Sequence, residues 1–495
     1  MSDRWHDLVR GCTFDDFLLL PQHGRLPRRD PASVDLSSPL TRRLTLKRPI
    51  VSANMDTITR AAMAVVLAEE GGIGVIDRGF RAGDIAPQVT EVEAVKRTQH
   101  GVIADPRAIA PGQRLAHARH MMTRIGVGTL AVVDADNRLV GLVTERDLRF
   151  AAGDALVADR MTPRQRLVVH EGPLDLGEAE RLMVAHKIKK LPLVDAGGRL
   201  TGLITARDLL HHQRHRFATR DDQGRLRVGA AVGATGDYLE RAAEVLRAGA
   251  DVLVIDIAHG HSEVMDRAIK AIRARHADVD LIAGNVATEE GARFLADRGV
   301  DAIKVGIGPG GGCSTRLTTS FGVPQVEALV RCRRAVGDAL PVIADGGIKR
   351  DGSLALALIV GGDTAMLGSA FAGTEETPGE IVMRPVVVPE SQRVVQVPFK
   401  VFRGMASLGA IRDRLDLEDA AAADVNAMGA EGLEFSVPAR GSVRTVIRDM
   451  LKHLCSAVSY GGALSLSELR KKVAAEPERY LVRLTDASRR ESFDR

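Results

Sequence analysis

The chain has 495 residues, of which 45% are hydrophobic and 3% aromatic. This length predicts more than one domain, and the apolar content is sufficient for packed cores. Because 68 basic and 64 acidic residues nearly cancel to a net charge of +4, and because few rings are present to stack bases, the composition argues against a nucleic-acid-binding protein.

The cysteines and the amino terminus favour a cytoplasmic protein. The four cysteines lack the C-x-x-C spacing of zinc sites and suggest no disulfide framework; they are Cys12, Cys313, Cys332 and Cys455. The start, Met1–Asp7, has no apolar core of a signal peptide, and no apolar run approaches the length of a membrane span. We therefore expect cytoplasmic localisation and no membrane partner.

Short apolar runs, each followed by a helix-like stretch, recur eight times. They are Ile50–Ala53, Ile73–Ile76, Val228–Ala234, Val252–Ile257, Leu281–Gly284, Ala302–Val305, Val342–Ala344 and Thr364–Leu367. Eight βα units predict an α/β protein with a (β/α)8 TIM barrel, although the periodicity alone also allows a doubly wound open sheet. In such a barrel the chemistry lies on the loops that follow the strands.

An insertion separates the second run from the third. Its length of roughly 120 residues far exceeds a normal βα connection, so it must form a domain of its own. We expect the inserted domain at residues 96–214 and the barrel at residues 1–95 and 215–495, with a flap at about 400–440.

The insertion contains an internal repeat, because Gly141–Leu148 recurs as Gly202–Leu209. The repeats are expected at about 96–152 and 159–212, and the pair resembles a tandem CBS (Bateman) module, which in other proteins binds adenine or guanine nucleotides. ATP and GTP are therefore the expected effectors. The residues expected to hold them also suit a simpler role as caps of the following helices, and they are Thr144, Asp147, Thr205 and Asp208.

The segment Gly306–Arg316 is a glycine-rich loop that follows the sixth run and contains a thiol. Five glycines and a proline suit neither helix nor strand, so the bare backbone lets another group approach closely. A cysteine there could be a small buried hydrophobe. The neighbours Ser314, Thr315 and Arg316 instead favour a reactive thiolate, so Cys313 is the predicted nucleophile.

An ordered set of motifs surrounds this loop. It comprises Thr13–Asp16, Ala53–Thr57, Glu70–Ile76, Asp345–Ile348, Gly368-Ser369 and Phe402–Met405. Together with the cysteine loop, these motifs resemble the IMP dehydrogenase and GMP reductase family over nearly the whole chain. The resemblance implies that Cys313 attacks C2 of a purine nucleotide, and that K⁺ binds the carbonyl oxygens of Gly308, Gly310 and Cys313.

The resemblance also implies a purine monophosphate site. The backbone amides of Gly347, Gly368 and Ser369 would hold the phosphate, and Asp345 would accept hydrogen bonds from the ribose. Further substrate-binding residues implied by the family are Met55, Met405, Ala406 and Glu431. Two hydroxyls of the dehydrogenases are missing here, because Gly311 replaces a serine and Phe402 replaces a tyrosine.

The segment after the fourth run resembles the part of the family that meets a nicotinamide. The resemblance places the cofactor at Asp256, at His259 and, at the end of the fifth strand, at Asn285, although His259 taken alone is better explained as a solvated loop histidine. No G-x-G-x-x-G motif follows a strand and opens a helix, so the dinucleotide would lie across barrel loops. NADPH is the expected cofactor, with NAD as the alternative.

The flap distinguishes the two family reactions. Dehydrogenases carry an Arg-Tyr pair there to activate water, whereas the best match is Arg414-Leu415 and no tyrosine occurs between Tyr238 and Tyr460. A reductase expels ammonia and needs no activated water, and Thr315 and Glu376 match its proton-handling pair. Dehydrogenases carry both of these residues too.

The reductase is favoured further by Asn54, which reductases typically carry. Against it, ordinary GMP reductases lack the inserted module and differ after Asp256. The prediction is therefore a CBS-containing GMP reductase, with GMP and IMP as substrate and product, in a homotetramer or homo-octamer. An IMP dehydrogenase and a catalytically silent nucleotide sensor are the alternatives.

Overall fold

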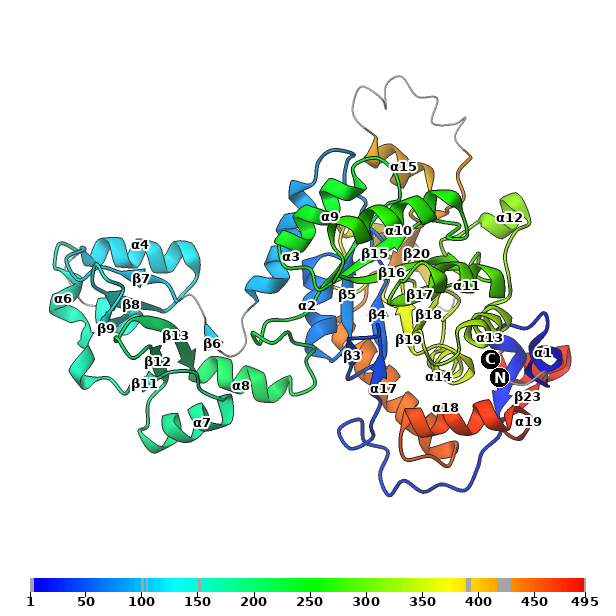
Figure 1. The fold of residues 1–495 in the computed structure, drawn as a ribbon, viewed down its shortest axis with the longest axis horizontal. Coiled ribbons are helices and arrows are strands. Elements are labelled where there is room, and N and C mark those ends of the chain that lie inside the picture. Colours follow the sequence, from blue (N-terminus) through cyan, green and yellow to red (C-terminus); the bar gives the residue numbers. More distant parts are fainter. Residues whose placement is uncertain are drawn as a thin grey trace. The chain divides into compact units, whose positions relative to one another are not determined.

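The eight predicted runs form a closed barrel in the computed structural model (Figure 1). Its strands are β4 (Ile50–Ser52), β5 (Ile73–Ile76), β14 (Gly229–Val232), β15 (Val252–Asp256), β16 (Asp280–Val286), β17 (Ala302–Val305), β18 (Val342–Asp345) and β19 (Thr364–Leu367). All neighbours pair in parallel, in the order β14-β15-β16-β17-β18-β19-β4-β5, and β5 closes the ring against β14. The (β/α)8 prediction is confirmed, and an open sheet is excluded.

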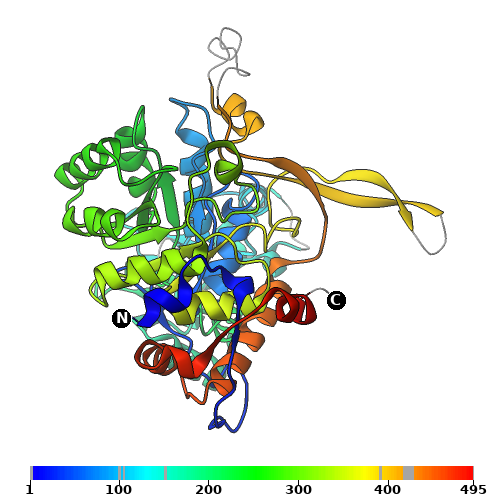
Figure 2. The ribbon, with the colours of Figure 1, turned by 90° about the vertical axis from the view of Figure 1, so that its right-hand side faces the viewer.

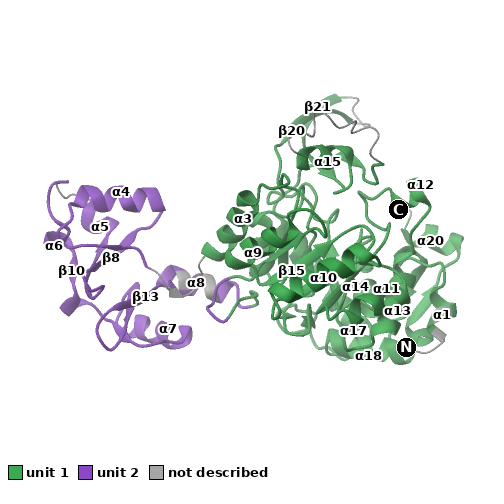
Figure 3. Ribbon diagram, turned by 45° about the horizontal axis from the view of Figure 1, so that its top comes forward, with its two compact units in different colours: residues 1–98, 217–221, 226–495 green, residues 99–216, 222–225 purple. Residues whose placement is uncertain are grey.

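The structure describes residues 4–98, 102–103, 106–149, 153–388, 393–415 and 429–493. The chain divides into two compact units (Figure 3). The barrel unit comprises residues 1–98, 217–221 and 226–495, and the inserted unit comprises residues 99–216 and 222–225. No helix in the described ranges is both long enough and apolar enough to cross a membrane.

Helices surround the barrel. They are α2 (Ala61–Glu69), α3 (Ala86–Arg97), α9 (Tyr238–Arg247), α10 (Glu263–Arg275), α11 (Glu289–Asp297), α13 (Gln325–Val336), α14 (Asp351–Val360) and α17 (Val443–Tyr460). Helix α14 is buried along nearly its whole length because α17 and α18 (Leu466–Ala475) pack over it, and its sequence is accordingly almost entirely apolar. The barrel interior is filled by branched and small side chains such as Val51, Val254 and Ile343.

The two chain ends pack together beside the barrel. Strand β1 (Phe17–Leu19) pairs with β23 (Leu481–Arg483), and β2 (Ser38–Pro39) pairs with β3 (Thr45–Leu46). The remaining terminal elements are α1 (Arg4–Val9), the 3₁₀ turn η1 (Phe14–Asp16), α19 (Pro477–Tyr480) and α20 (Asp486–Phe493).

A small antiparallel sheet follows β19. It consists of β20 (Val382–Val388), β21 (Arg393–Arg403) and β22 (Glu434–Pro438), with α15 (Leu408–Arg414) between the last two strands. Figure 2 shows the ribbon of β20 and β21 extending away from the barrel. The carboxyl end of β21 leads back to the barrel mouth, where Glu431 and Leu433 of the expected flap contact the cysteine loop. Residues 416–428 of that flap lie outside the described residues.

The inserted unit consists of two similar halves. One holds a sheet of β7 (Ala108–Ile109), β8 (Thr129–Val133), β9 (Leu139–Thr144) and β10 (Thr162–Pro163), and the other a sheet of β6 (Val102–Ile103), β11 (His170–Glu171), β12 (Lys190–Val194) and β13 (Leu200–Thr205). Their helices are α4 (Leu115–Ile125), α5 (Glu145–Leu148), α6 (Val157–Arg160), α7 (Leu176–Ala185) and α8 (Ala206–Arg214). Side chains from β8, β9, β12 and β13 share one small apolar cluster, which joins the halves.

The sequence copies occupy equivalent places in the two halves, each as a strand followed by a helix. In the first half the backbone amide and the hydroxyl of Thr144 both donate to Asp147, at 2.8 and 2.7 Å, so this pair caps α5. In the second half Thr205 ends β13 immediately before α8. The side chain of Asp208 lies outside the described residues.

Candidate active site

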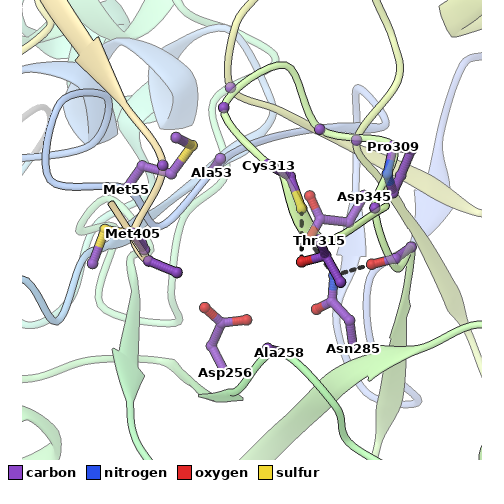
Figure 4. Close-up of a pocket in the computed structure, with 18 of the residues that line it drawn as sticks. Ala53, Met55, Asp256, Ala258, Asn285, Pro309, Cys313, Thr315, Asp345 and Met405 are labelled. Carbon is purple, nitrogen blue, oxygen red and sulfur yellow. Dashed lines mark hydrogen bonds between the residues drawn. The ribbon is translucent and has the colours of Figure 1, made fainter. Parts of the chain in front are cut away.

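A cavity of about 370 Å³ opens at the carboxyl ends of the barrel strands. Its wall is built from the ends of β4, β15, β16, β17, β18 and β19 and from the chain segment that surrounds α15. This is the face on which (β/α)8 enzymes carry their chemistry, and the volume suits a small-molecule ligand. Figure 4 shows Cys313, Thr315, Asp345 and Asn285 on one side of the cavity and Met55 and Met405 on another.

Cys313 lies in the loop between β17 and α12 (Thr315–Thr319). Its sulfur is 3.3 Å from the hydroxyl oxygen of Thr315, and that hydroxyl donates to Glu431 Oε2 at 2.6 Å. Thiol, hydroxyl and carboxylate therefore form a continuous hydrogen-bonded chain at the cavity wall. Such a chain can move a proton between the sulfur and the carboxylate.

The backbone around Glu431 is fixed directly to the cysteine loop. The amide of Ser314 donates to the carbonyl of Glu431 at 2.8 Å, and the amide of Leu433 donates to the carbonyl of Gly312 at 2.9 Å. A Cβ at Gly312 would lie 2.9 Å from the amide nitrogen of Gly404, so this close approach of two backbones requires glycine. The return of the chain from β21 thus places the carboxylate beside the thiol.

Glu376 does not join this chain, which corrects the expected pairing with Thr315. Its carboxylate accepts hydrogen bonds from the hydroxyl of Ser442 and, at 2.7 Å, from the amide of Val443. It therefore holds the amino terminus of α17, where free backbone amides attract a carboxylate, and it does not line the cavity. Glu376 and Glu431 were both expected at this site, but only Glu431 is linked to the thiol, through the hydroxyl of Thr315.

Arg316, which we expected to favour a thiolate, lies behind the cavity wall, and its charge interacts favourably with that of Cys313. Its guanidinium donates to the carbonyl of Val323 and lies against Gly308 and Gly322, whose bare backbones leave room for it. Burial lowers the pKa of Arg316. The side chain therefore holds the loop after Cys313 in shape and does not line the cavity.

Lys304 is the feature that the sequence analysis missed. Its side chain is 2% exposed, and its Nζ lies 2.7 Å from Asp256 Oδ1 and 2.7 Å from Asp345 Oδ2, with Asn285 Oδ1 as a third acceptor. Asn285 in turn donates to Asp345 Oδ2 at 3.0 Å. One buried ammonium thus links side chains at the ends of β15, β16 and β18.

The charges of this network stabilise one another. Burial alone would lower the pKa of Lys304, but the carboxylates of Asp256 and Asp345 outweigh burial and raise it. Burial would raise the pKa of Asp256, yet Lys304 holds that pKa below its usual range. A lysine inside the apolar run Ala302–Val305 was the signal in the sequence, because a charged side chain is buried only when it is paired.

The expected substrate residues all line this one cavity. They are Met55, Asp345, Gly347, Gly368, Ser369, Met405, Ala406 and Glu431. Phe402, which stands where the family carries tyrosine, is 1% exposed and packs against Phe435 with ring centroids 5.2 Å apart. A Cβ at Gly311 would meet the Cβ of Ser369 at 3.5 Å, an ordinary contact, so the serine missing there is not excluded by lack of space.

The expected cofactor residues are only partly brought together. Asp256 and Asn285 line the cavity, as do the adjacent Ile257 and Ala258. His259 is exposed and lies outside the lining, with its ring centroid 6.3 Å from that of His261. The structure therefore supports two of the three residues as cavity residues.

The loop expected to hold K⁺ also lies at the cavity. Gly308, Gly310 and Cys313 all line it, and the carbonyl of Gly310 accepts from the amide of Cys313 at 3.1 Å, which leaves a second lone pair on that oxygen. Neutral carbonyl oxygens in a glycine turn suit a weakly hydrated monovalent cation. The described residues contain no cluster of acidic, histidine or cysteine side chains that could hold a metal ion in another way.

The similarity to known proteins extends over nearly the whole chain. Residues 11–494 match the family model described as "IMP dehydrogenase / GMP reductase domain". The inosine-5'-monophosphate dehydrogenase of Aquifex aeolicus is 40% identical over 489 residues, which cover 98% of this chain and 95% of the relative. That of Nitrosopumilus maritimus is 40% identical over 473 residues, covering 94% and 95%.

The similar solved structures are of a different enzyme, a GMP reductase. The GMP reductase of Trypanosoma brucei in complex with guanosine 5'-monophosphate is similar with a TM-score of 0.84 and 36% identity, over 99% of both chains. A structure of that enzyme with guanosine 5'-triphosphate has a TM-score of 0.75 and 34% identity, over 96% of this chain and 98% of the other. The curated relatives are thus named as dehydrogenases, whereas the similar solved structures are named as reductases.

Proposed function

Because the chain belongs to the IMP dehydrogenase and GMP reductase family, and is therefore a purine nucleotide oxidoreductase, we propose that it catalyses the NADPH-dependent reductive deamination of GMP to IMP and ammonia. The observation that carries the proposal is that no tyrosine lies between Tyr238 and Tyr460, so the flap lacks the family's water-activating Arg-Tyr pair. A GMP reductase similar over 99% of both chains also removes the objection that reductases lack the inserted unit.

In the first half of the reaction, the sulfur of Cys313 bonds to C2 of GMP and the bond from C2 to the exocyclic nitrogen breaks. The nitrogen leaves as ammonia, so it gains the proton that the thiol gives up. Thr315 lies between the sulfur and the carboxylate of Glu431, which makes this pair the route for that proton.

In the second half, C2 would accept a hydride, which is the chemistry that a nicotinamide dinucleotide would supply when bound. The bond between C2 and the sulfur then breaks, which frees IMP and leaves Cys313 as a thiolate, and a proton from the solvent restores the thiol. Asp256 and Asn285, both held by Lys304, border the part of the cavity next to the cysteine loop and are proposed to orient the nicotinamide. K⁺ on the carbonyls of Gly308, Gly310 and Cys313 would stiffen the loop.

The inserted unit is proposed to be a tandem CBS module that binds ATP or GTP and regulates the barrel. Its two similar halves, joined by a shared apolar cluster, support this proposal. Thr144 and Asp147 cap α5, and Thr205 directly precedes α8, so a helix begins at the repeat motif in both copies, and a helix amino terminus suits a phosphate. The homotetramer or homo-octamer expected from the family stays a prediction.

The test follows absorbance at the nicotinamide band with GMP plus NADPH and, separately, with IMP plus NAD. We expect NADPH oxidation with GMP and release of ammonia, and we expect ATP or GTP to change the rate. Identical rates with and without nucleotide would leave the inserted unit as a scaffold.

The dehydrogenase is retained as a second candidate for one reason. Arg414, the best match to the flap arginine, lines the cavity, and the curated relatives at 40% identity are named as dehydrogenases. Robust NADH formation from IMP, with XMP as product, would replace the reductase proposal. Turnover with neither pair of substrates would favour the silent nucleotide sensor.

The proposed proton route through Thr315 and Glu431 leads to a separate prediction. In Glu431→Gln, kcat should fall about 10²- to 10⁴-fold because the amide cannot take up or release the proton, while the Kd for GMP changes little. Steady-state kinetics and calorimetric titration with GMP measure the two effects.

Glu376→Gln is the matched control. It should retain near wild-type kcat, because the glutamine oxygen can still accept from the amide of Val443 while its NH2 group donates to the hydroxyl of Ser442 at the start of α17. If Glu376→Gln slowed ammonia release and Glu431→Gln did not, the assignment of the proton route to Glu431 would be wrong.

A further inference from the structure

A second buried lysine lies outside the cavity, on the small sheet. Lys400 of β21 is 5% exposed, and its Nζ donates to the carbonyl oxygens of Thr374, Glu375 and Thr377 at 3.0, 3.2 and 2.8 Å. Three carbonyls engage all three N–H groups of an ammonium. A charge is buried at little cost only when its donors are satisfied in this way, so the loop 374–377 is shaped around this side chain.

This loop is the direct continuation of Gly368 and Ser369, which line the cavity and are expected to hold the monophosphate. The carbonyls of Gly368 and Ser369 accept from the amides of Phe371 and Ala372 at 2.9 and 3.3 Å. The carbonyl of Phe371 in turn accepts from the amide and the hydroxyl of Thr374, at 3.2 and 2.9 Å. A series of buried turns therefore connects the acceptors of Lys400 to the expected phosphate residues.

The backbone of Lys400 belongs to the segment that carries Glu431 to the thiol. Gly404 follows Lys400 by four residues, and its amide donates to the carbonyl of Leu433 at 2.9 Å. The amide of Leu433 donates to the carbonyl of Gly312 in the cysteine loop, also at 2.9 Å, and Glu431 lies two residues before Leu433. A shift of β21 would therefore move the carboxylate relative to the cysteine.

A second cation joins the same two segments from outside. Arg440, two residues beyond β22, donates through Nε to the carbonyl of Ala372 at 3.1 Å and through Nη2 to that of Ala370. Because Arg440 is exposed, water can replace its contacts. The acceptors of Lys400 face a buried ammonium and have no such replacement, so Lys400 is the stronger of the two connections.

We infer that Lys400 is a positioning residue for the purine nucleotide, because its ammonium fixes the segment of Gly368 and Ser369 against the segment of Glu431. It acts through these residues, since it does not line the cavity itself. The inference rests on the proposed function in assigning Gly368 and Ser369 to the monophosphate and Glu431 to the proton route.

Removing the side chain and supplying its ammonium separately tests this role in the full-length protein. Lys400→Ala should bind GMP and IMP about tenfold or more weakly, and kcat should fall about tenfold or more, because both sides of the site shift. The cation n-propylammonium has the atoms that the variant lacks beyond Cβ. At a fixed K⁺ concentration it should restore affinity and kcat to within about threefold of wild type. Tetramethylammonium, which has no N–H to donate, should restore neither.

Two further variants are the controls. Methionine fills the space of the lysine without its charge, so Lys400→Met should show the same losses and no restoration by n-propylammonium. Lys452→Ala removes an exposed lysine of α17 that pairs with Asp449, and it should change neither affinity nor kcat. Calorimetric titration measures the affinities, and absorbance at the nicotinamide band measures kcat.

The inference is overturned if Lys400→Met binds GMP and IMP as the wild type does, or if n-propylammonium does not reduce the losses in Lys400→Ala. Should Lys400→Ala fail to fold, the affinity of Lys400→Met decides alone. The binding measurements need no turnover. Failure of the GMP reductase assay, together with nucleotide affinity that n-propylammonium restores, would therefore reject the proposed reaction and retain the role of Lys400.

Discussion

Replacing Cys313 with serine is expected to lower kcat by about four orders of magnitude or more, because the variant loses the nucleophile that bonds to C2. A serine hydroxyl is a far weaker nucleophile than a thiolate at neutral pH. The hydroxyl can still occupy the place of the thiol next to Thr315, so the fold and the affinity for GMP should be retained. Single-turnover kinetics and calorimetric titration with GMP measure both effects.

Two further cysteines provide controls for this variant. Cys332 and Cys455 are buried, burial raises the pKa of both thiols, and that of Cys455 is raised to about 11. Neither lines the cavity, so Cys332→Ser and Cys455→Ser should keep near wild-type kcat. Activity of Cys313→Ser above roughly a hundredth of wild type would argue against a covalent intermediate.

Replacing Lys304 with methionine should lower the free energy of unfolding by about 3–5 kcal/mol, because it leaves Asp256 and Asp345 without the buried cation that pairs them. Methionine fills a similar volume, so the loss is electrostatic. Turnover should fall as well, since Asn285 loses its contact to the ammonium. Urea unfolding measures the stability change.

The loss should also depend on pH. In the wild type the pKa of Asp256 lies below its ordinary value of 3.8 and that of Lys304 above 10.5, so the pair contributes fully between these values; it is lost in stronger acid and in stronger base. In Lys304→Met, burial raises the pKa of Asp256. The folded variant then binds more protons than the unfolded chain, so its stability falls from pH 5 to pH 8.

The exposed Lys471 on α18 is the control for this variant. Lys471→Met should change stability by less than about 0.5 kcal/mol at either pH, because its side chain lies at the surface. A loss in Lys304→Met that is equally large at pH 5 and pH 8 would mean that lost packing, and not unpaired charge, destabilises the variant.

The barrel was predictable because its strands are parallel. Helices cover such strands outside and side chains fill the interior, so each strand appears as a continuous apolar run, as in Ile73–Ile76 and Val252–Asp256. The family was predictable too, since its motifs are short segments with fixed local chemistry. The family model matches residues 11–494 and confirms that prediction.

The partner of the thiol was not predictable in the same way. Glu376 and Glu431 both follow the last barrel strand, and their order in the sequence does not reveal which one the chain returns to Thr315. The answer depends on the antiparallel contact between Gly432 and Cys313, which joins distant segments. The position of His259 outside the cavity lining was not predictable either, because it lies only one residue beyond Ala258, which lines the cavity.

The inserted unit interrupts the barrel after only two of its strands. The pairs β5–β14 and β4–β19 both join distant parts of the chain. β5 can therefore pair with β14 only after the insertion has been synthesised, and β4 can pair with β19 only after the other barrel strands have been synthesised. The entropy of closing a loop grows only with the logarithm of its length, and the inserted unit has apolar clusters of its own, so the interruption adds little to the cost of folding. The interruption instead delays the closure of the barrel during synthesis. No closed barrel can form on the ribosome until Leu367 has emerged to meet Ser52.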